Sequence, residues 1–423
     1  MEVNRTREET VRLLQQKGVR IPCPHSVDIG PEVSPDMISD KGVVIHSGCK
    51  IYGAKTVIMT GAELGYEAPA TIHNCQLGRG VKLKGGFFDE STFLENAALG
   101  SGAQIREGCL LEEEARAAHT VGLKQTILFP YVTLGSLINF CDCLMSGGTD
   151  RESHSEVGSS YIHFNYTPNQ DKATGSLIGD VPRGVMLKEA PIFLGGQGGL
   201  VGPVRINYGT TVAAGTIVRK DLLKEGHILL GQKSVAKSLP FQLGLYPFVK
   251  RIIVMNTIYI ANLLALRRWY LDVRSRFFKS IPRETGLWEG ALGRTDQAID
   301  ERITRLGQVA GRMPRSIELT RKTGKPDRTQ GIIQKMEAFA RQWPELEALY
   351  KEARSREGRP EYQDRFLSEL EKGIQTEGLD YIKVIKGLNA EAAESGTLWL
   401  QGLVEETERE VREALPSVMG RGG

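Results

Sequence analysis

The chain has 423 residues, a formal net charge of +3 at pH 7 and 25% charged residues. This length allows two domains or more, and the nearly balanced charge gives no global signal for nucleic-acid binding, so we expect no nucleic-acid partner. The cysteines have neither the spacing of a disulfide framework nor that of a zinc site, so we interpret them as reduced hydrophobic residues and predict no metal. They are Cys23, Cys49, Cys75, Cys109, Cys141 and Cys143.

The first twenty residues, MEVNRTREETVRLLQQKGVR, have the pattern of an amphipathic helix. They contain no apolar h-region, so no secretory signal is visible and we expect a cytoplasmic protein. We assign residues 1–25 to an N-terminal helix and linker.

A repeat of six residues dominates the following segment. Short apolar triplets alternate there with Gly, Asn, Asp and Ser, and most of the 48 glycines of the chain precede residue 235. Ladders of apolar residues six positions apart are Leu194, Leu200, Ile206, Val212 and Val218; Ile45 and Ile51; Leu99, Ile105 and Leu111; and Leu128, Leu134 and Phe140. This period fits neither an α-helix nor a hairpin meander.

The period of six predicts an all-β, left-handed parallel β-helix built on hexapeptide repeats over residues 26–240. In such a solenoid each short strand occupies one side of a triangular coil, and one apolar side chain per hexad points into the prism. Small residues are expected at the corners, where φ can be positive. The alternative is a β-sandwich with Gly-rich turns, whose strands would alternate with period two.

After Pro240 the composition predicts a mainly α-helical region over residues 241–423. Helices are expected within 241–280 and at about 297–312, 331–355, 361–376 and 389–415. The apolar run Ile252–Leu266 is too short and too polar at its middle to span a membrane. We expect this region to cap the solenoid, whose end strands need covering, or to pack against the prism. Alternatively, basic clusters flanking the apolar helix could let residues 250–279 contact a protein partner or lie on an anionic membrane surface as a peripheral contact.

The hexad rhythm breaks at Tyr161–Lys172, and an insertion in a solenoid is typical of a functional loop. This loop carries Asn165, Asn169 and Lys172, which could bind an acyl or phosphate group. The segment SSYIHFNYTPNQDKATGSLIGD resembles the loop of the hexapeptide-repeat acyltransferases. It is closest to the acetyltransferase domain of the bacterial bifunctional UDP-N-acetylglucosamine pyrophosphorylase / glucosamine-1-phosphate N-acetyltransferase. The segment PIFLGGQGGLVGPVRINYGTTVAAGTIVRKD is similar to the next coils of that family, and the resemblance covers about residues 10–235.

The resemblance implies a set of binding residues. Asn165 and Tyr166 correspond to the pair that lines the acetyl-CoA and amino-sugar site, and Lys172 corresponds to the lysine of the loop. Gly196 replaces a coil-edge serine of the family. The alanine whose backbone contacts CoA falls on Ala213 or Ala214.

The catalytic base of the family is a histidine on a coil before the loop. Counting forward from Asn139 gives His154, whereas counting back from Asn165 gives Asp142. His163 is nearer to Asn165 in sequence, and a lone strand histidine is more often structural. We therefore predict His154 as the base and leave His163 as the alternative.

Two departures from the family bear on the substrate. The arginine that binds the sugar phosphate would fall near Thr126, and the nearest cation is Lys124. We expect no counterpart of the family's nucleotidyltransferase half in this sequence, because no Gly-rich loop with basic residues follows a first strand.

The sequence therefore predicts an acyl-CoA-dependent N-acetyltransferase that acts on an amino sugar, its phosphate or nucleotide. A histidine would deprotonate the amine, Asn165 or backbone N–H groups would stabilise the oxyanion, and a groove between the β-helices of a homotrimer would hold both substrates. The first alternative is a catalytically silent β-helix that binds a sugar nucleotide or scaffolds partners. The second, a metal site like that of γ-carbonic anhydrases, is disfavoured by the offsets of His119, His154 and His163.

Overall fold

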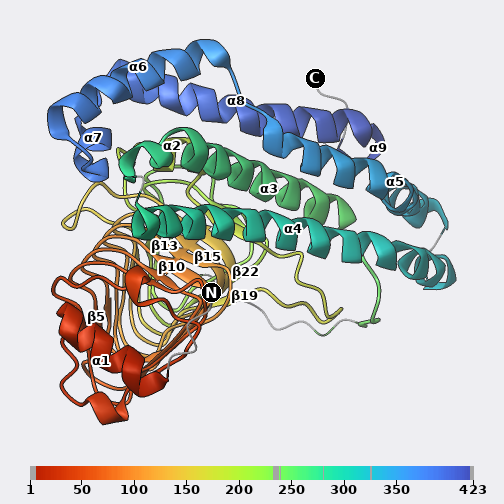
Figure 1. The fold of residues 1–423 in the computed structure, drawn as a ribbon. Coiled ribbons are helices and arrows are strands. Elements are labelled where there is room, and N and C mark those ends of the chain that lie inside the picture. Colours follow the sequence, from red (N-terminus) through yellow and green to blue (C-terminus); the bar gives the residue numbers. More distant parts are fainter. Residues whose placement is uncertain (1–5, 232–237, 239, 280, 324–325, 420–423) are drawn as a thin grey trace.

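The computed structural model describes residues 6–231, 238, 240–279, 281–323 and 326–419. A β-solenoid of about eleven turns spans residues 28–229, and a helical region follows over residues 249–419. Both parts of the predicted fold class are confirmed. Figure 1 shows the coils of the solenoid stacked on one another with the helices on one side.

Every strand pairing in the solenoid is parallel, and the strands form three faces. Face 1 consists of β1 (Asp28–Ile29), β3 (Lys50–Tyr52), β6 (Ala70–His73), β9 (Gly86–Asp89), β12 (Ala103–Ile105), the first halves of β15 (Gly122–Leu128) and β17 (Asn139–Met145), β19 (Ile162–Phe164), β22 (Gly199–Val201) and β25 (Ile217–Val218). Face 2 consists of β4 (Val57–Ile58), β7 (Gln76–Leu77), β10 (Ser91–Phe93), β13 (Cys109–Leu111), the second halves of β15 and β17, β20 (Ser176–Ile178) and β23 (Arg205–Ile206). Face 3 consists of β2 (Val44–Ile45), β5 (Glu63–Leu64), β8 (Lys82–Leu83), β11 (Ala98–Leu99), β14 (Arg116–Ala117), β16 (Thr133–Leu134), β18 (Glu156–Val157), β21 (Phe193–Leu194), β24 (Thr211–Val212) and β26 (Ile228–Leu229).

The predicted apolar ladders form the core of the prism. All five residues of the ladder from Leu194 to Val218 are at most 1% exposed, and the other three ladders are equally buried. Burying an aliphatic side chain of this size stabilises a fold by roughly 1.5–3 kcal/mol. The six-residue period is thus confirmed as the spacing between successive inward positions.

The expectation that small residues turn the chain is confirmed at many corners, where glycines such as Gly61 and Gly80 have positive φ values. At the corner between faces 1 and 2, however, Asn74, Glu90, Gln125 and Asp142 turn four of the coils, with φ values of 49°, 40°, 48° and 58°. This left-handed region admits residues with a Cβ at a modest cost, and Asn and Asp are enriched in it. The consequence is a column of polar side chains along that edge of the solenoid.

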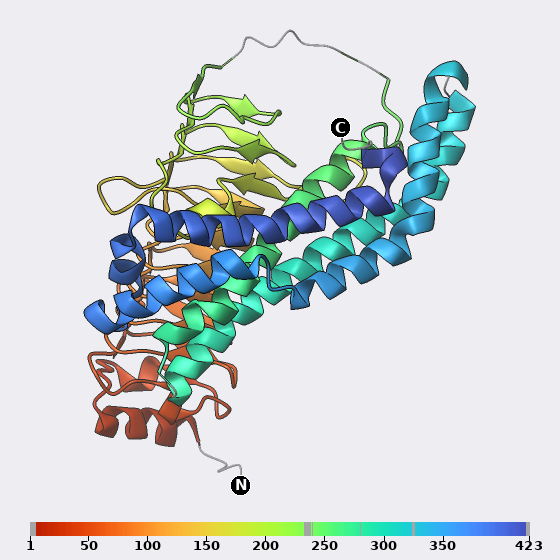
Figure 2. The same ribbon diagram turned by 90° about the horizontal axis from the view of Figure 1, so that it is seen from above.

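Helix α1 (Arg7–Lys17) covers the N-terminal end of the solenoid (Figure 2). Thr6 and Glu9 form a capping box at its start, and Gly18 ends it with a φ of 115°. Val11 and Leu14 are buried, and the Lys17 ammonium donates to the carbonyls of Pro35 and Ile38 at 2.7 and 2.8 Å.

The remaining helices are α2 (Val181–Gly184), α3 (Val249–Asp272), α4 (Pro282–Thr323), α5 (Pro326–Glu352), α6 (Pro360–Glu377), α7 (Tyr381–Gly387), α8 (Ala390–Ala414) and α9 (Pro416–Met419). Short 3-10 turns are η1 (Pro24–Ser26), η2 (Pro35–Met37), η3 (Arg274–Phe277) and η4 (Ala353–Ser355). The four later segments predicted as helical lie in α4, α5, α6 and α8, with η4 at the end of the second. Helix α4 is longer than expected, and α7 was not predicted.

The helical region packs against the side of the prism, which is one of the two arrangements expected for it. Helix α4 packs on β4, β7, β10 and β13, and α3 packs on β20, so both cover face 2 (Figures 1 and 2). Close approach depends on small residues of α4. A Cβ on Gly290 would lie 2.3 Å from Oε1 of Gln76, and one on Gly286 would lie 3.0 Å from Cε of Met37.

Helix α3 is a core element, which corrects the alternative that residues 250–279 lie on a membrane. Among the described helices it alone is apolar and long enough to cross a membrane, but 78% of its most apolar window is buried within the protein. Most of its basic residues are also paired, including Arg251 with Asp221 at 2.8 Å and Arg267 with Asp296 at 2.7 Å. No continuous apolar face of this helix therefore remains for lipid.

Buried carboxylates join the helices to the solenoid. Glu112 accepts a hydrogen bond from the Tyr270 hydroxyl, and the neighbouring Glu113 forms an ion pair with Arg274, whose side chain is 1% exposed. Burial raises the pKa of Glu112 to about 7, with Glu113 adding to the rise and Arg274 opposing it.

We expect this carboxylate to make stability fall with pH. The folded-state pKa lies above the ordinary value of 4.5. Folding therefore becomes less favourable as the pH rises from about 4.5, and the loss is complete above about 7, at roughly 3 kcal/mol. Glu112→Gln keeps an acceptor for Tyr270 and should flatten the dependence of melting temperature on pH across this window.

The matched control is Glu114→Gln, because Glu114 forms a partly exposed pair with Arg116. Melting curves recorded between about pH 5 and pH 8 cover the titration of a carboxyl raised in this way and give the comparison. If Glu112→Gln retained the slope of the parent protein, titration of Glu112 would not be its cause.

Candidate functional site

The loop that interrupts the hexad rhythm projects from the corner between faces 1 and 2. It leaves face 1 after Phe164 of β19 and returns to face 2 at Ser176 of β20. Asn165 is half-buried at its start, and Tyr166 is 57% exposed. The loop is therefore reachable from solvent at its beginning.

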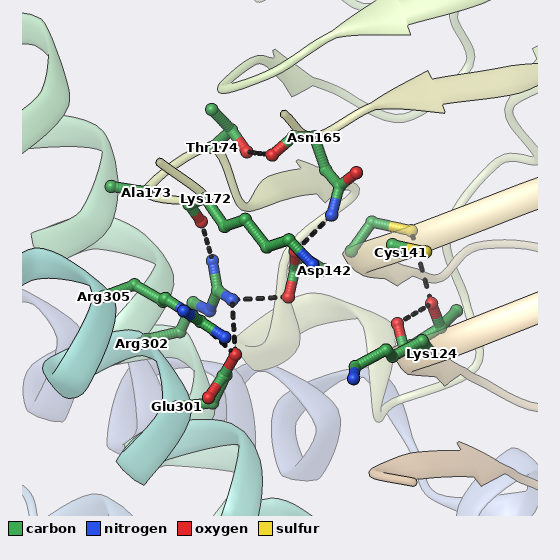
Figure 3. A network of polar contacts seen from close by, with 12 residues as sticks. Lys124, Cys141, Asp142, Asn165, Lys172, Ala173, Thr174, Glu301, Arg302 and Arg305 are labelled. Atoms are coloured by element: carbon green, nitrogen blue, oxygen red, sulfur yellow. Dashed lines mark hydrogen bonds and ion pairs between the residues drawn. The ribbon is translucent and has the colours of Figure 1, made fainter. Parts of the chain in front are cut away.

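Asn165 takes part in a buried polar network at this corner (Figure 3). Its amide Nδ2 donates to Oδ2 of Asp142 at 2.6 Å. The other carboxylate oxygen, Oδ1, forms an ion pair with Arg302 of α4, and the two side chains are 4% and 1% exposed. Arg302 also donates to the Lys172 carbonyl at 2.8 Å. The sequence pattern pointed to Asn165, Asp142 and Lys172 but not to Arg302.

The helical region holds the rest of the loop as well. Arg312 of α4 donates to the carbonyls of Asn169 and Gln170 at 2.6 and 3.0 Å, and the Tyr246 hydroxyl donates to Asp171 at 3.0 Å. Asn256 of α3 donates to the Ala173 carbonyl at 3.0 Å. The conformation of the loop therefore depends on helices that follow it by more than seventy residues.

Lys172 lies near face 1, and its ammonium is in no ion pair that the described residues form. Burial, together with the charge of Asp142, raises the pKa of the Cys141 thiol to about 11. The positive charges of Lys172 and Lys124 oppose this rise. Lys124 itself pairs with Glu107. Of the two lysines, Lys172 is thus the one that remains available to a ligand anion.

His163 is a core residue. It is 3% exposed, its Nδ1 contacts the Cys141 carbonyl, and its Nε2 lies 2.8 Å from the Ser176 hydroxyl. The carbonyl requires a proton on Nδ1, so Nε2 accepts from the serine and the ring is neutral. Burial also lowers the pKa of His163. This arrangement is that of a structural histidine.

His154 lies at a different corner, between faces 2 and 3. It precedes β18 in the loop after β17, and its backbone bridges to that of Gly148. Its Nε2 is 4.0 Å from Oε2 of Glu156, and Nδ1 is buried without a hydrogen-bond partner among the described residues. In its own chain His154 is thus separated from Asn165 by the strand of face 2, and its role as base stays a prediction.

Gly196, Ala213 and Ala214 come together at the third corner, between faces 3 and 1. The Gly196 carbonyl accepts from the Gly215 N–H at 2.9 Å. A Cβ on Gly196 would lie 2.7 Å from the Ser159 carbonyl oxygen. The packing of successive coils therefore favours glycine at 196, and exposed backbone and small side chains line this edge.

Face 1 connects the two predicted groups of binding residues. The loop group of Asn165, Tyr166 and Lys172 stands at one edge, and the coil-edge group of Gly196, Ala213 and Ala214 stands at the other. Between them Ile162, Phe164 and Ile217 point outward and are 40–42% exposed. Adjacent exposed apolar residues of this kind are typical of a surface that binds a ligand or a protein.

Comparisons with known proteins agree with the resemblance seen in the sequence. No protein-family model matches the chain. The chain is 27% identical over 236 residues to the bifunctional protein GlmU of Oleidesulfovibrio alaskensis, which covers 55% of this chain and 46% of that protein. It is 28% identical over 222 residues to the bifunctional protein GlmU of Acinetobacter baumannii strain AYE, covering 52% and 43%.

The chain thus spans less than half the length of these curated relatives. Among solved structures, LpxA from Acinetobacter baumannii aligns with 66% of this chain and 95% of its own, at 13% identity and a TM-score of 0.23. The similarity to GlmU confirms the resemblance seen in the sequence: over about half of its length the chain is distantly similar to that protein.

Proposed function

We propose that the protein is an acyl-CoA-dependent N-acyltransferase, with acetyl-CoA as donor and an amino sugar, its phosphate or nucleotide as acceptor. The observation that carries the proposal is that the two predicted groups of binding residues, the loop group and the coil-edge group, lie on the two edges of face 1. The distant similarity to GlmU supports acyl transfer as the reaction class.

In this proposal face 1 is one wall of the binding groove. The coil edge at Gly196 and Ala213 offers backbone groups to CoA, and the outward apolar residues Ile162 and Phe164 offer a surface to its pantetheine arm. Lys172 offers a cation to a phosphate of either substrate. The remaining wall would come from a second copy of the chain, because face 2 is already covered by the helical region.

The reaction needs one base and one set of hydrogen-bond donors. The acceptor amine attacks the thioester carbonyl, and a C–N bond forms as the C–S bond breaks. The proton leaves the amine for the base and reaches the departing thiolate, giving an amide and free CoA. We propose that His154 of a neighbouring copy is that base, since His154 of the same chain lies at another corner.

A catalytically silent β-helix is the second candidate. The Asp142–Arg302 pair favours it, because the amide nitrogen of Asn165 and the carboxylate of Asp142, where counting back from Asn165 places the base, are already engaged by the protein itself. Such a protein would bind a sugar nucleotide or organise partners without transferring an acyl group.

Calorimetry with acetyl-CoA, followed by thiol detection with a panel of amino sugars, distinguishes the two candidates. We expect acetyl-CoA binding and thiol release that requires an amino sugar. Binding of a sugar nucleotide without acetyl-CoA binding would support the silent β-helix. Absence of both acetyl-CoA binding and thiol release would overturn the proposed activity.

We expect a homotrimer in solution, since a groove along face 1 needs a neighbouring copy to complete it. Light scattering coupled to size exclusion should give three times the 46.6 kDa mass of the chain. Phe164→Asp places a charge in the middle of the exposed apolar surface and should shift this mass towards that of the monomer. A clean monomer for the parent protein at micromolar concentration would contradict the shared groove.

A further inference from the structure

The amide of Asn165 has a fixed orientation in the polar network of Figure 3. An asparagine side chain carries a donor nitrogen and an acceptor oxygen, and its neighbours decide which way each points. Here Nδ2 faces the Asp142 carboxylate at 2.6 Å. The reverse orientation would place Oδ1 against a carboxylate, where two acceptors would repel each other. Asp142 therefore turns Oδ1 away from the network.

Arg302 compensates the charge of Asp142 and holds its carboxylate in place. The carboxylate is 4% exposed, and a carboxylate so buried needs a cation beside it. Arg302 supplies that cation and at the same time donates to the Lys172 carbonyl at 2.8 Å. One guanidinium thus contacts both Asp142 at the corner of the solenoid and Lys172 in the loop. Charge-assisted contacts of this kind are short and directional.

The oxygen left over is an acceptor. Oδ1 of Asn165 is in no hydrogen bond that the described residues form, and it is not among their buried unpaired atoms. It therefore offers its lone pairs to solvent or to a ligand at the edge of face 1. This differs from the expectation that Asn165 donates to an oxyanion, since the amide presents its acceptor end outward.

We infer that Arg302 of α4 is a positioning residue for the acyltransfer site. Through Asp142 it orients Asn165 so that Oδ1 accepts a hydrogen bond from an N–H or O–H group of the substrate. The inference rests on the proposed function and deepens it, because it assigns the helical region a part in substrate recognition. The donor group belongs either to the pantetheine arm of acetyl-CoA or to the amino sugar.

The test uses the double variant Arg302→Gln/Asp142→Asn in the full chain. Either single neutralisation would leave a buried unpaired charge and could unfold the protein, whereas the double variant removes both charges together. The carboxamide that replaces the Asp142 carboxylate can both donate and accept, so the orientation of Asn165 is no longer specified. We expect the affinity for one substrate to fall about tenfold, the effect of one lost hydrogen bond, with kcat nearly unchanged.

Two separate measurements identify the source of the donor group. A weaker calorimetric Kd for acetyl-CoA, by about tenfold, assigns it to the pantetheine arm, and a KM for the amino sugar raised by about the same factor assigns it to the acceptor. The single variant Arg302→Lys retains a cation beside Asp142, so it should keep most of the substrate affinity that the double variant loses. Arg305→Gln, about one turn further along α4 and paired with Glu301 at 2.8 Å, is the matched control and should change neither value.

Hydrogen exchange of residues 165–173 provides a readout that does not require activity. We expect faster exchange of this loop in the double variant and no change in Arg305→Gln. If the parent protein proves inactive while loop exchange still increases, the proposed function fails and the positioning role of Arg302 stands. Unchanged substrate affinity together with unchanged loop exchange would overturn the inference.

Discussion

Val212→Asp is expected to abolish the folded state. Val212 is fully buried in the prism, where it pairs with Leu194 of the preceding coil and Leu229 of the following one. Its neighbours are apolar side chains of the stacked ladder, so an aspartate there would be buried without a partner or forced to take up a proton. Mutations that bury an unpaired charge are among the most destabilising, at about 4–5 kcal/mol or more.

Thr211→Asp is the matched control. Thr211 is the adjacent residue of β24 and is half-buried, with its side chain on the opposite side of the strand. Circular dichroism should show a cooperative melting transition for Thr211→Asp and none for Val212→Asp. A soluble Val212→Asp variant that melts like the parent protein would mean that the register of the hexads is wrong.

The hexad ladders made the solenoid predictable, because a single period fixes which residue of each hexad points inward. The corners were less predictable. A positive φ is usually associated with glycine, yet Asp142 and Glu90 adopt it here. Their identity as corner residues became visible only from the stacking of coils, which a local pattern does not contain.

The residues of the candidate site were also predictable only in part. Asn165 and Lys172 were found from the break in the hexad rhythm, the resemblance added their roles, and they do lie in one loop. Arg302 was missed because it follows Asp142 by 160 residues and lies in a helix rich in arginine. One signal could have found it: α4 carries Gly286, Gly290, Arg294, Ala298 and Arg302 at every fourth position. This spacing marks one side of a helix.

That stripe faces the solenoid. Arg294 donates to the Glu90 carbonyl, and Ala298 is 5% exposed. A helix rises about 1.5 Å per residue and stacked strands are about 4.8 Å apart, so α4 advances by one coil roughly every three residues. Gly290, which lies near Gln76, and Arg302, which lies near Asp142, therefore belong to one line of contact between α4 and the solenoid. Two glycines on one side of a charged helix could thus have indicated close packing. Which coil of the solenoid each residue of that side contacts is decided by the tertiary structure.

His154→Ala is expected to reduce turnover by about 10²–10⁴ and to leave acetyl-CoA affinity nearly unchanged, as removal of a general base does. The reason is chemical: the acceptor amine must lose its proton during attack, and an imidazole is the side chain best suited to accept a proton near neutral pH. A base must come within about 3 Å of the amine. Within one chain, the second half of β17 separates His154 from Asn165, a span of about 10 Å for three strand residues.

If His154 is the base, the base and the binding loop come from different copies, and this consequence of the proposal can be tested by mixing. His154→Ala and Asn165→Ala should each be nearly inactive alone. After unfolding and refolding together, mixed trimers contain some sites with an intact His154 from one copy and an intact Asn165 from another, so activity should reappear. Activity that never returns on mixing would place both residues in one chain or remove His154 from the site.

A His154→Ala variant with unchanged turnover would eliminate His154 as the base. Because both ring nitrogens of His163 are already occupied, the silent β-helix would then be the better description of the protein.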